Sequence, residues 1–62
     1  MYIVQFIRKD NQVNEEYLYR QYEQAQKHFM LFDDDDSDLY IKINLIEEDE
    51  KGERVLDCKF YI

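Results

Sequence analysis

Residues 39–62 read LYIKINLIEEDEKGERVLDCKFYI, and two alternating runs within them decide the fold. Leu39 to Glu47 alternates between apolar and mostly polar positions, and Arg54 to Ile62 alternates again. Successive side chains of a strand point to opposite faces, so each run predicts a β-strand. Between them lies a turn at residues 50–53 with the only glycine, Gly52, for which positive φ costs least. The stretch therefore predicts a β-hairpin.

Working outward, residues 2–9 are rich in Tyr, Ile, Val and Phe and predict another strand, followed by a turn at Asp10 and Asn11. Two interpretations compete for the next residues. One is a long helix from Glu15 to Phe32, which gives βαββ. The other is a strand over Val13 to Arg20 and a shorter helix from about Gln21 to Phe32, which gives ββαββ. We favour ββαββ, because a three-stranded sheet is harder to stabilise at this size.

The expected fold is thus α+β, a single domain over residues 1–62, with an antiparallel sheet and one helix on one sheet face. The helix presents one apolar face made of Tyr22, Ala25, Phe29 and Phe32. It should pack on the apolar side of the strands, which comprises Leu39, Ile41, Ile43, Leu45, Leu56, Cys58, Phe60, Val4 and Phe6.

The opposite sheet face is also apolar. It is expected to carry Ile3, Ile7, Tyr40, Ile46 and Tyr61, together with Tyr17 and Tyr19 if the second strand exists. No second helix is left to cover it, and tyrosine is common at protein interfaces. We therefore predict a partner-binding surface that includes Tyr40, Tyr61, Ile46 and Ile3.

Charge is concentrated in one part of the chain. The net charge is −7, but residues 33–50 hold nine acids and one base, so this segment carries −8 and the rest +1. Such a patch favours a basic partner. We predict that Asp33, Asp34, Asp35, Asp36, Glu47 and Glu48 contribute to partner binding.

The composition disfavours several classes of function and location. The acidic balance opposes binding to a nucleic-acid backbone or to an anionic membrane surface. There is no apolar run of about 18 residues and no signal-peptide pattern at the N-terminus. One cysteine cannot form an internal disulfide, and a lone thiol fits a reducing cytoplasmic compartment.

Three features of the sequence suggest chemistry at first sight. Asp34, Asp36 and Asp38 have the spacing of a calcium loop, but Leu39 and Leu45 stand where that loop needs Gly and Glu, so we expect a solvated loop and no metal site. Cys58 lies in an apolar set and is expected to be buried and inert. His28 has no partner that suggests a catalytic triad and is expected at the solvent edge. We therefore expect no enzyme activity and no cofactor.

The segment Tyr22-Glu23-x-Ala25-x-x-His28-Phe29 follows a strand pair and precedes an acidic hairpin with Gly-Glu at its turn. This order resembles small acidic proteins of bacteria, phages and mobile elements. The resemblance implies a ββαββ fold and assigns no site.

Together these observations predict a noncatalytic protein-interaction module that self-associates as a homodimer through the open sheet face, with the acidic segment selecting a basic partner. The alternatives are a nucleic-acid-mimicking inhibitor of a DNA-binding protein and a structural accessory protein.

Overall fold

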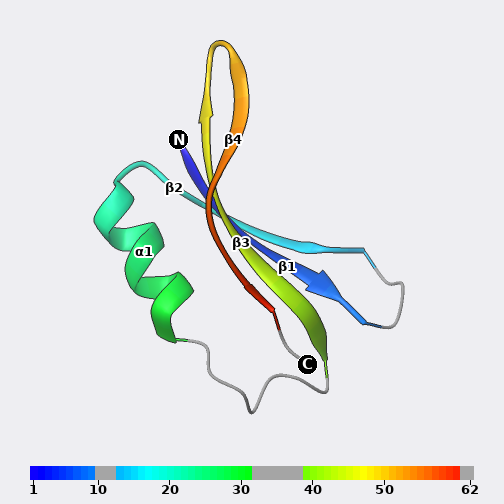
Figure 1. Ribbon diagram of the computed structural model, residues 1–62. Coiled ribbons are helices and arrows are strands. Elements are labelled where there is room, and N and C mark those ends of the chain that lie inside the picture. The colour runs from blue at the N-terminus through cyan, green and yellow to red at the C-terminus, as the bar shows by residue number, and fades with distance from the viewer. Residues whose placement is uncertain (10–12, 32–38, 61–62) are drawn as a thin grey trace.

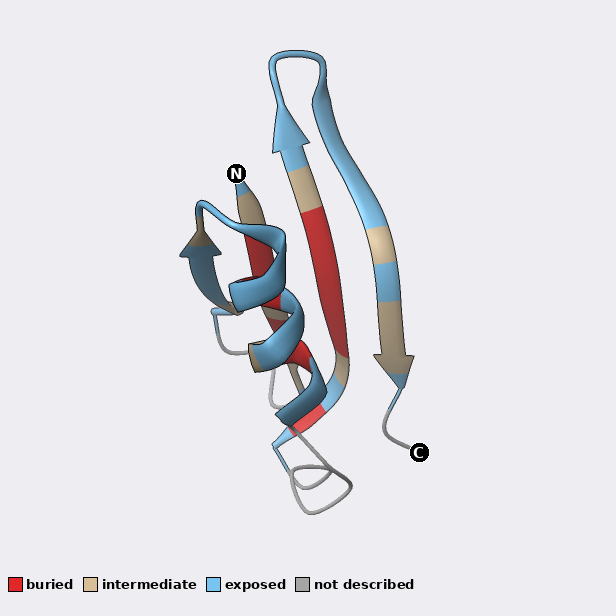
Figure 2. Ribbon diagram, turned by 90° about the vertical axis from the view of Figure 1, so that its left-hand side faces the viewer, coloured by how far each residue is buried: buried red, intermediate tan, exposed pale blue. Residues whose placement is uncertain are grey.

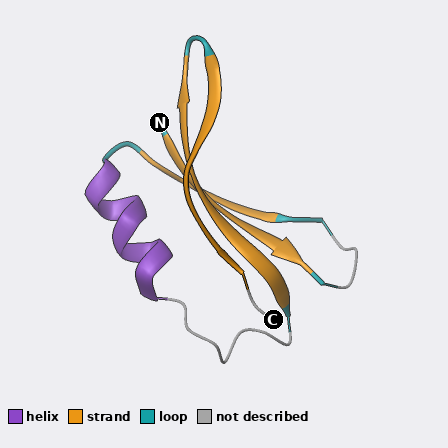
Figure 3. Cartoon of the chain, in the orientation of Figure 1, coloured by secondary structure: helices purple, strands orange, loops and turns teal. Residues whose placement is uncertain are grey.

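The computed structural model describes residues 1–9, 13–31 and 39–60. The elements follow in the order β1 (Tyr2–Arg8), β2 (Glu15–Tyr19), α1 (Tyr22–Leu31), β3 (Tyr40–Asp49) and β4 (Gly52–Phe60). Figure 1 shows them as one twisted sheet with the helix on one side, and Figure 3 separates helix from strand. The predicted α+β class and the ββαββ order are confirmed, and residues 15–19 are a strand rather than the start of a long helix.

The strands lie in the order β2-β1-β3-β4, and each neighbouring pair is antiparallel. Strands β2 and β3 both pair with β1, so the connection between them must pass over β1. Helix α1 forms that connection and therefore covers the centre of the sheet. Its backbone lies close to β1, β2 and β3 but not to β4.

The core lies between α1 and the two central strands, as the buried segments in Figure 2 show. Ala25 and Phe29 are the buried residues of the helix. They belong to one cluster with four strand residues of the expected apolar face and one tyrosine: Val4, Phe6, Ile43, Leu45 and Tyr40. Burial of each large side chain contributes roughly 1.5–3 kcal/mol before the loss of conformational entropy.

A tight turn that contains Gly52 closes the β3–β4 hairpin, as expected. Gly52 has φ 127°, which side-chain-bearing residues rarely adopt. The backbone N–H of Lys51 donates to Oδ1 of Asp49 over 2.8 Å, and Asp49 pairs with Gly52. The glycine and the aspartate together set this tight turn.

Two bulges correct the expected assignment of side chains to faces. On β3, Lys42 pairs with Ile7 but Tyr40 pairs with Arg8, which leaves Ile41 as an extra residue. A bulge breaks the period of two. Tyr40 therefore lies on the helix side and is buried, whereas Leu39 and Ile41, which were expected in the core, are exposed.

The second bulge lies on β4. Ile46 pairs with Val55 and Leu45 pairs with Asp57, so Leu56 is the extra residue. Leu56 packs against the core as expected. Beyond the bulge, Cys58 pairs with Asn44 and Phe60 pairs with Lys42, so both face away from the helix. The prediction that Cys58 and Phe60 face the helix is wrong for this reason.

Candidate interaction surface on the open sheet face

The sheet face opposite the helix carries a band of aliphatic side chains that crosses all four strands. The strand register places Leu18, Ile3, Ile46 and Val55 side by side, one from each strand, and we call these four the aliphatic row. The middle pair is buried, with Ile3 3% and Ile46 5% exposed. The outer pair is open, with Leu18 58% and Val55 57% exposed. The row thus offers apolar surface at both edges of the sheet.

A polar row lies beside the aliphatic row. It consists of Glu16, Gln5, Asn44 and Cys58, again one residue from each strand. Asn44 is buried, and its Nδ2 donates to Oε1 of Gln5 over 3.0 Å. Nε2 of Gln5 then donates to Oε2 of Glu16 over 2.8 Å. Because these amides satisfy one another, the polar row sets a fixed boundary to the apolar band.

A third row follows the polar row and contains Ile7, Lys42 and Phe60. Nζ of Lys42 lies 5.6 Å from the centre of the Phe60 ring, within the range of a cation–π contact. Phe60 is otherwise exposed. Lys42 therefore brings a positive charge to the open face at the end away from the hairpin turn.

The predicted partner-binding residues divide between the two faces. Ile3 and Ile46 lie on the open face as predicted, although both are buried. Tyr40 was expected there too, and that placement is wrong because the β3 bulge turns it toward the helix. Tyr17 and Tyr19 also lie on the helix side, where their rings contact His28. Tyr61 falls outside the described residues.

Sequence reasoning missed the exposed members of this surface, Leu18, Val55 and Phe60. The apolar alternation of Arg54 to Ile62 contained part of the signal, since it separated Val55 from Leu56. What was missing was the register, which alone brings Leu18 and Val55 into one row with the two isoleucines.

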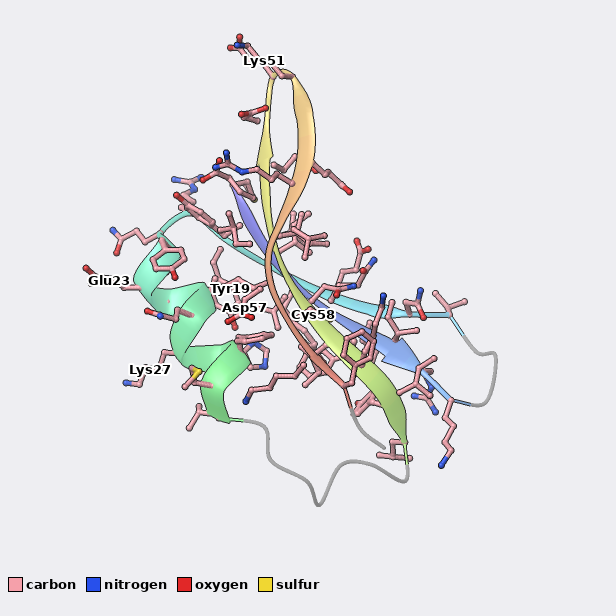
Figure 4. The ribbon with its side chains drawn as sticks, viewed as in Figure 1. Tyr19, Glu23, Lys27, Lys51, Asp57 and Cys58 are labelled. Atoms are coloured by element: carbon pink, nitrogen blue, oxygen red, sulfur yellow. The ribbon has the colours of Figure 1, made fainter. Side chains whose placement is uncertain are left out.

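The acidic residues of the described chain gather at the β3–β4 hairpin. We define the acidic hairpin as residues 47–53, which hold five acids and one base, Lys51. Figure 4 shows Lys51 at its tip. Glu47 is held by Arg54, whose Nη2 lies 2.8 Å from Oε1 of the carboxylate. The predicted site residues Asp33, Asp34, Asp35 and Asp36 lie outside the described residues.

On the helix side, three tyrosines, a histidine and one carboxylate form a cluster. Its members are Glu15, Tyr17, Tyr19, His28 and Tyr40. The carboxylate of Glu15 accepts hydrogen bonds from the hydroxyls of Tyr40 (2.8 Å) and Tyr17 (3.0 Å) and from Nη1 of Arg8 (3.2 Å). The bond from Tyr40 is the main cause that lowers the pKa of Glu15. The same bond raises the pKa of Tyr40 to about 12.

His28 is half-buried, and its ring belongs to this cluster. Its Nδ1 lies 2.7 Å from the hydroxyl oxygen of Tyr19, and its ring contacts those of Tyr17 and Phe6. Burial lowers the pKa of His28 below its ordinary value of 6.5. By contrast, Glu23 and Lys27 of the same helix point away from the sheet (Figure 4).

Within residues 1–9, 13–31 and 39–60, no three His, Cys, Asp or Glu side chains gather as a metal site would require. No helix in this part of the chain is long and apolar enough to cross a membrane. No protein-family model, curated protein or solved structure matches this chain.

Proposed function

We propose that this protein is a noncatalytic interaction module that docks a protein partner on its open sheet face. The aliphatic row is the observation that carries the proposal. Antiparallel sheets with one solvated face usually place polar side chains there. Here four aliphatic residues from four strands form one band, and its two outer members are more than half exposed. Contact with a protein would remove this apolar surface from water.

The polar groups on the helix side support a binding role over a catalytic one. A general base needs a pKa near the working pH. Glu15 instead accepts three hydrogen bonds, and its pKa is lowered. The pKa of Tyr40 is raised to about 12, which makes its hydroxyl harder to ionise. These groups tie β1, β2 and β3 together and serve the fold.

The acidic hairpin supplies the second part of the proposal. It adjoins the aliphatic row, since Ile46 directly precedes Glu47 and Val55 directly follows Arg54. Charges at the rim of an interface mainly affect partner choice and the association rate. We propose that Glu47 and Glu48, with the other acids of the hairpin, select a partner that carries basic groups beside an apolar patch.

Capture by matched surface variants tests this function. The immobilised protein is compared with Leu18→Lys and Val55→Lys, which place a charge at either end of the aliphatic row. Met30→Lys is the control, because Met30 is an exposed apolar residue of the helix. We expect binding partners to be lost with the two row variants and kept with the control. Partners that bind all four proteins equally would refute the role of the open face.

A further inference from the structure

We infer that the open face binds a second copy of this chain, with the two aliphatic rows stacked face to face and the strands of the two sheets antiparallel. This inference rests on the proposed function and names the partner for the same surface. It is argued from the chemistry of the row, the protection of the sheet edges and the distribution of charge.

The row is self-complementary in its chemistry. All four residues are aliphatic, so a two-fold axis that runs along the row places apolar groups on apolar groups across all four strands. A two-fold interface uses the same patch on both copies. The open face also carries Glu16 and Lys42 on one side of the row and Glu48 and Glu53 on the other side. An apolar row suits a second apolar row, and the charges on either side of it bear on the direction of stacking.

The two edge strands of the sheet disfavour edge-to-edge pairing, which is the other common way in which sheets associate. Edge-to-edge pairing needs a long, regular and flat edge strand. One edge strand, β2, has only five residues and begins with Glu15 and Glu16. The other, β4, is interrupted by the bulge at Leu56 and carries Arg54, Asp57 and Lys59. Both edges are protected, so pairing of sheets through their edges is disfavoured relative to stacking through the open face.

Charge decides the direction of stacking. The acidic hairpin lies at one end of the sheet, and two such ends would repel each other if the strands ran in the same direction. In the antiparallel arrangement they lie at opposite ends. Lys42 stands four residues before Ile46 and Glu50 four residues after it. At about 3.3 Å per residue both lie about 13 Å from the axis, so Lys42 of one copy faces the acidic hairpin of the other.

A short chain also gains from such a dimer. Below about 70–80 residues a single core rarely gives more than about 3–5 kcal/mol, and oligomerisation is one way to add burial. Stacking two sheets face to face would bury Leu18 and Val55 from each copy. Ile3 and Ile46 are already 3% and 5% exposed, so the added burial comes from these two outer residues.

Sedimentation of the full chain over a concentration series tests the second copy. We expect a species of twice the 7.8 kDa monomer mass. Leu18→Lys and Val55→Lys should weaken the dimer at least about tenfold, because each buries a charge against the apolar row of the second copy. Met30→Lys should leave it unchanged, and circular dichroism checks that every variant is folded. A chain that stays monomeric at millimolar concentration overturns the inference, and so does a dimer that both row variants leave intact.

A charge swap tests the direction of stacking. Lys42→Glu should raise the dissociation constant about two- to fivefold, the scale of an exposed ion pair. Adding Glu50→Lys to that variant should return the dissociation constant to the wild-type value. Lys27→Glu makes the same charge change on the outer side of the helix and should have no effect. If the double variant dimerises no more tightly than Lys42→Glu alone, the antiparallel arrangement is overturned.

The two proposals can fail separately. If the chain is monomeric but its captured partners are still lost with Leu18→Lys and Val55→Lys, the second copy is rejected and the docking function stands. If sedimentation shows a dimer that is insensitive to the row variants and the captured proteins are insensitive as well, both proposals are rejected.

Discussion

The hydroxyl of Tyr40 donates a hydrogen bond of 2.8 Å to the carboxylate of Glu15, although the two residues are 25 positions apart. The bond joins the first residue of β3 to the first residue of β2, which lie on either side of β1. It exists because the β3 bulge turns Tyr40 toward the helix side. The bond therefore locks the bulge and the β2 edge into one arrangement.

Removal of this hydroxyl should destabilise the fold. Tyr40→Phe keeps the ring and its packing against Phe6 but deletes the donor. We expect the free energy of unfolding to fall by about 1–2 kcal/mol, because bonds to charged groups contribute more than neutral ones. Urea denaturation at pH 7 measures the change. Leu39→Ala, an exposed position directly before Tyr40, should leave stability within about 0.5 kcal/mol.

The same pair predicts a loss of stability in alkali. The pKa of Tyr40 is raised from 10.0 to about 12 in the folded protein, so the unfolded chain loses its proton first. This stability is fully present below pH 10 and is lost as the pH rises through about 12. Urea denaturation at several pH values between 9 and 12 measures this loss of stability. The wild type should lose more stability over this range than Tyr40→Phe, and parallel curves would contradict the assignment.

His28 predicts a separate effect at mildly acidic pH. Burial among aromatic rings lowers its pKa below the ordinary value of 6.5, so the folded state binds the proton less tightly than the unfolded state does. The stability contributed by neutral His28 is present above pH 6.5 and is lost as the pH falls below it. NMR titration of the ring gives the folded pKa directly. A measured value above 6.5 would refute this prediction, and His28→Gln should abolish the dependence between pH 7 and pH 5.

Much of the fold could be predicted because its signals are local. The alternation of β3 and β4, the glycine of their turn and the apolar face of the helix each act within a few residues. Ala25 and Phe29 were expected in the core from their spacing alone, and both are buried. The prediction of a strand over Val13 to Arg20, observed as Glu15–Tyr19, follows from the need for enough strands to support one helix.

The errors on β3 and β4 come from the bulges, and those on Tyr17 and Tyr19 come from the register of β2 on β1. A bulge depends on how two strands far apart in the sequence pair, and the sequence of a single strand does not reveal it. One extra residue on β3 moved Tyr40 to the helix side, and one on β4 moved Cys58 and Phe60 to the open face. Half-buried Cys58 is therefore not the core residue that its apolar neighbours indicated. The candidate surface shifted from tyrosines to aliphatic residues because of the β3 bulge at Tyr40 and the register of β2 at Tyr17 and Tyr19.

Phe29 anchors the helix to the sheet and should be the most sensitive position of α1. Its side chain is fully buried, and Nζ of Lys59 lies 5.2 Å from the centre of its ring. Phe29→Ala should cost about 3–5 kcal/mol through lost burial and the cavity left behind. In a domain this small, that loss should unfold the chain at room temperature, as circular dichroism would show. Leu31→Ala, at an exposed position of the same helix, should remain folded.

Gly52 offers a test of backbone strain that is separate from packing. Its φ of 127° lies outside the range that residues with a Cβ atom readily adopt, and an added Cβ would meet no atom within 4 Å. Gly52→Ala should therefore destabilise the hairpin by about 1–3 kcal/mol through the backbone alone. Thermal denaturation measures the change, with the adjacent Glu53→Ala as the control. Equal melting temperatures for Gly52→Ala and the wild type would show that the turn does not need a glycine.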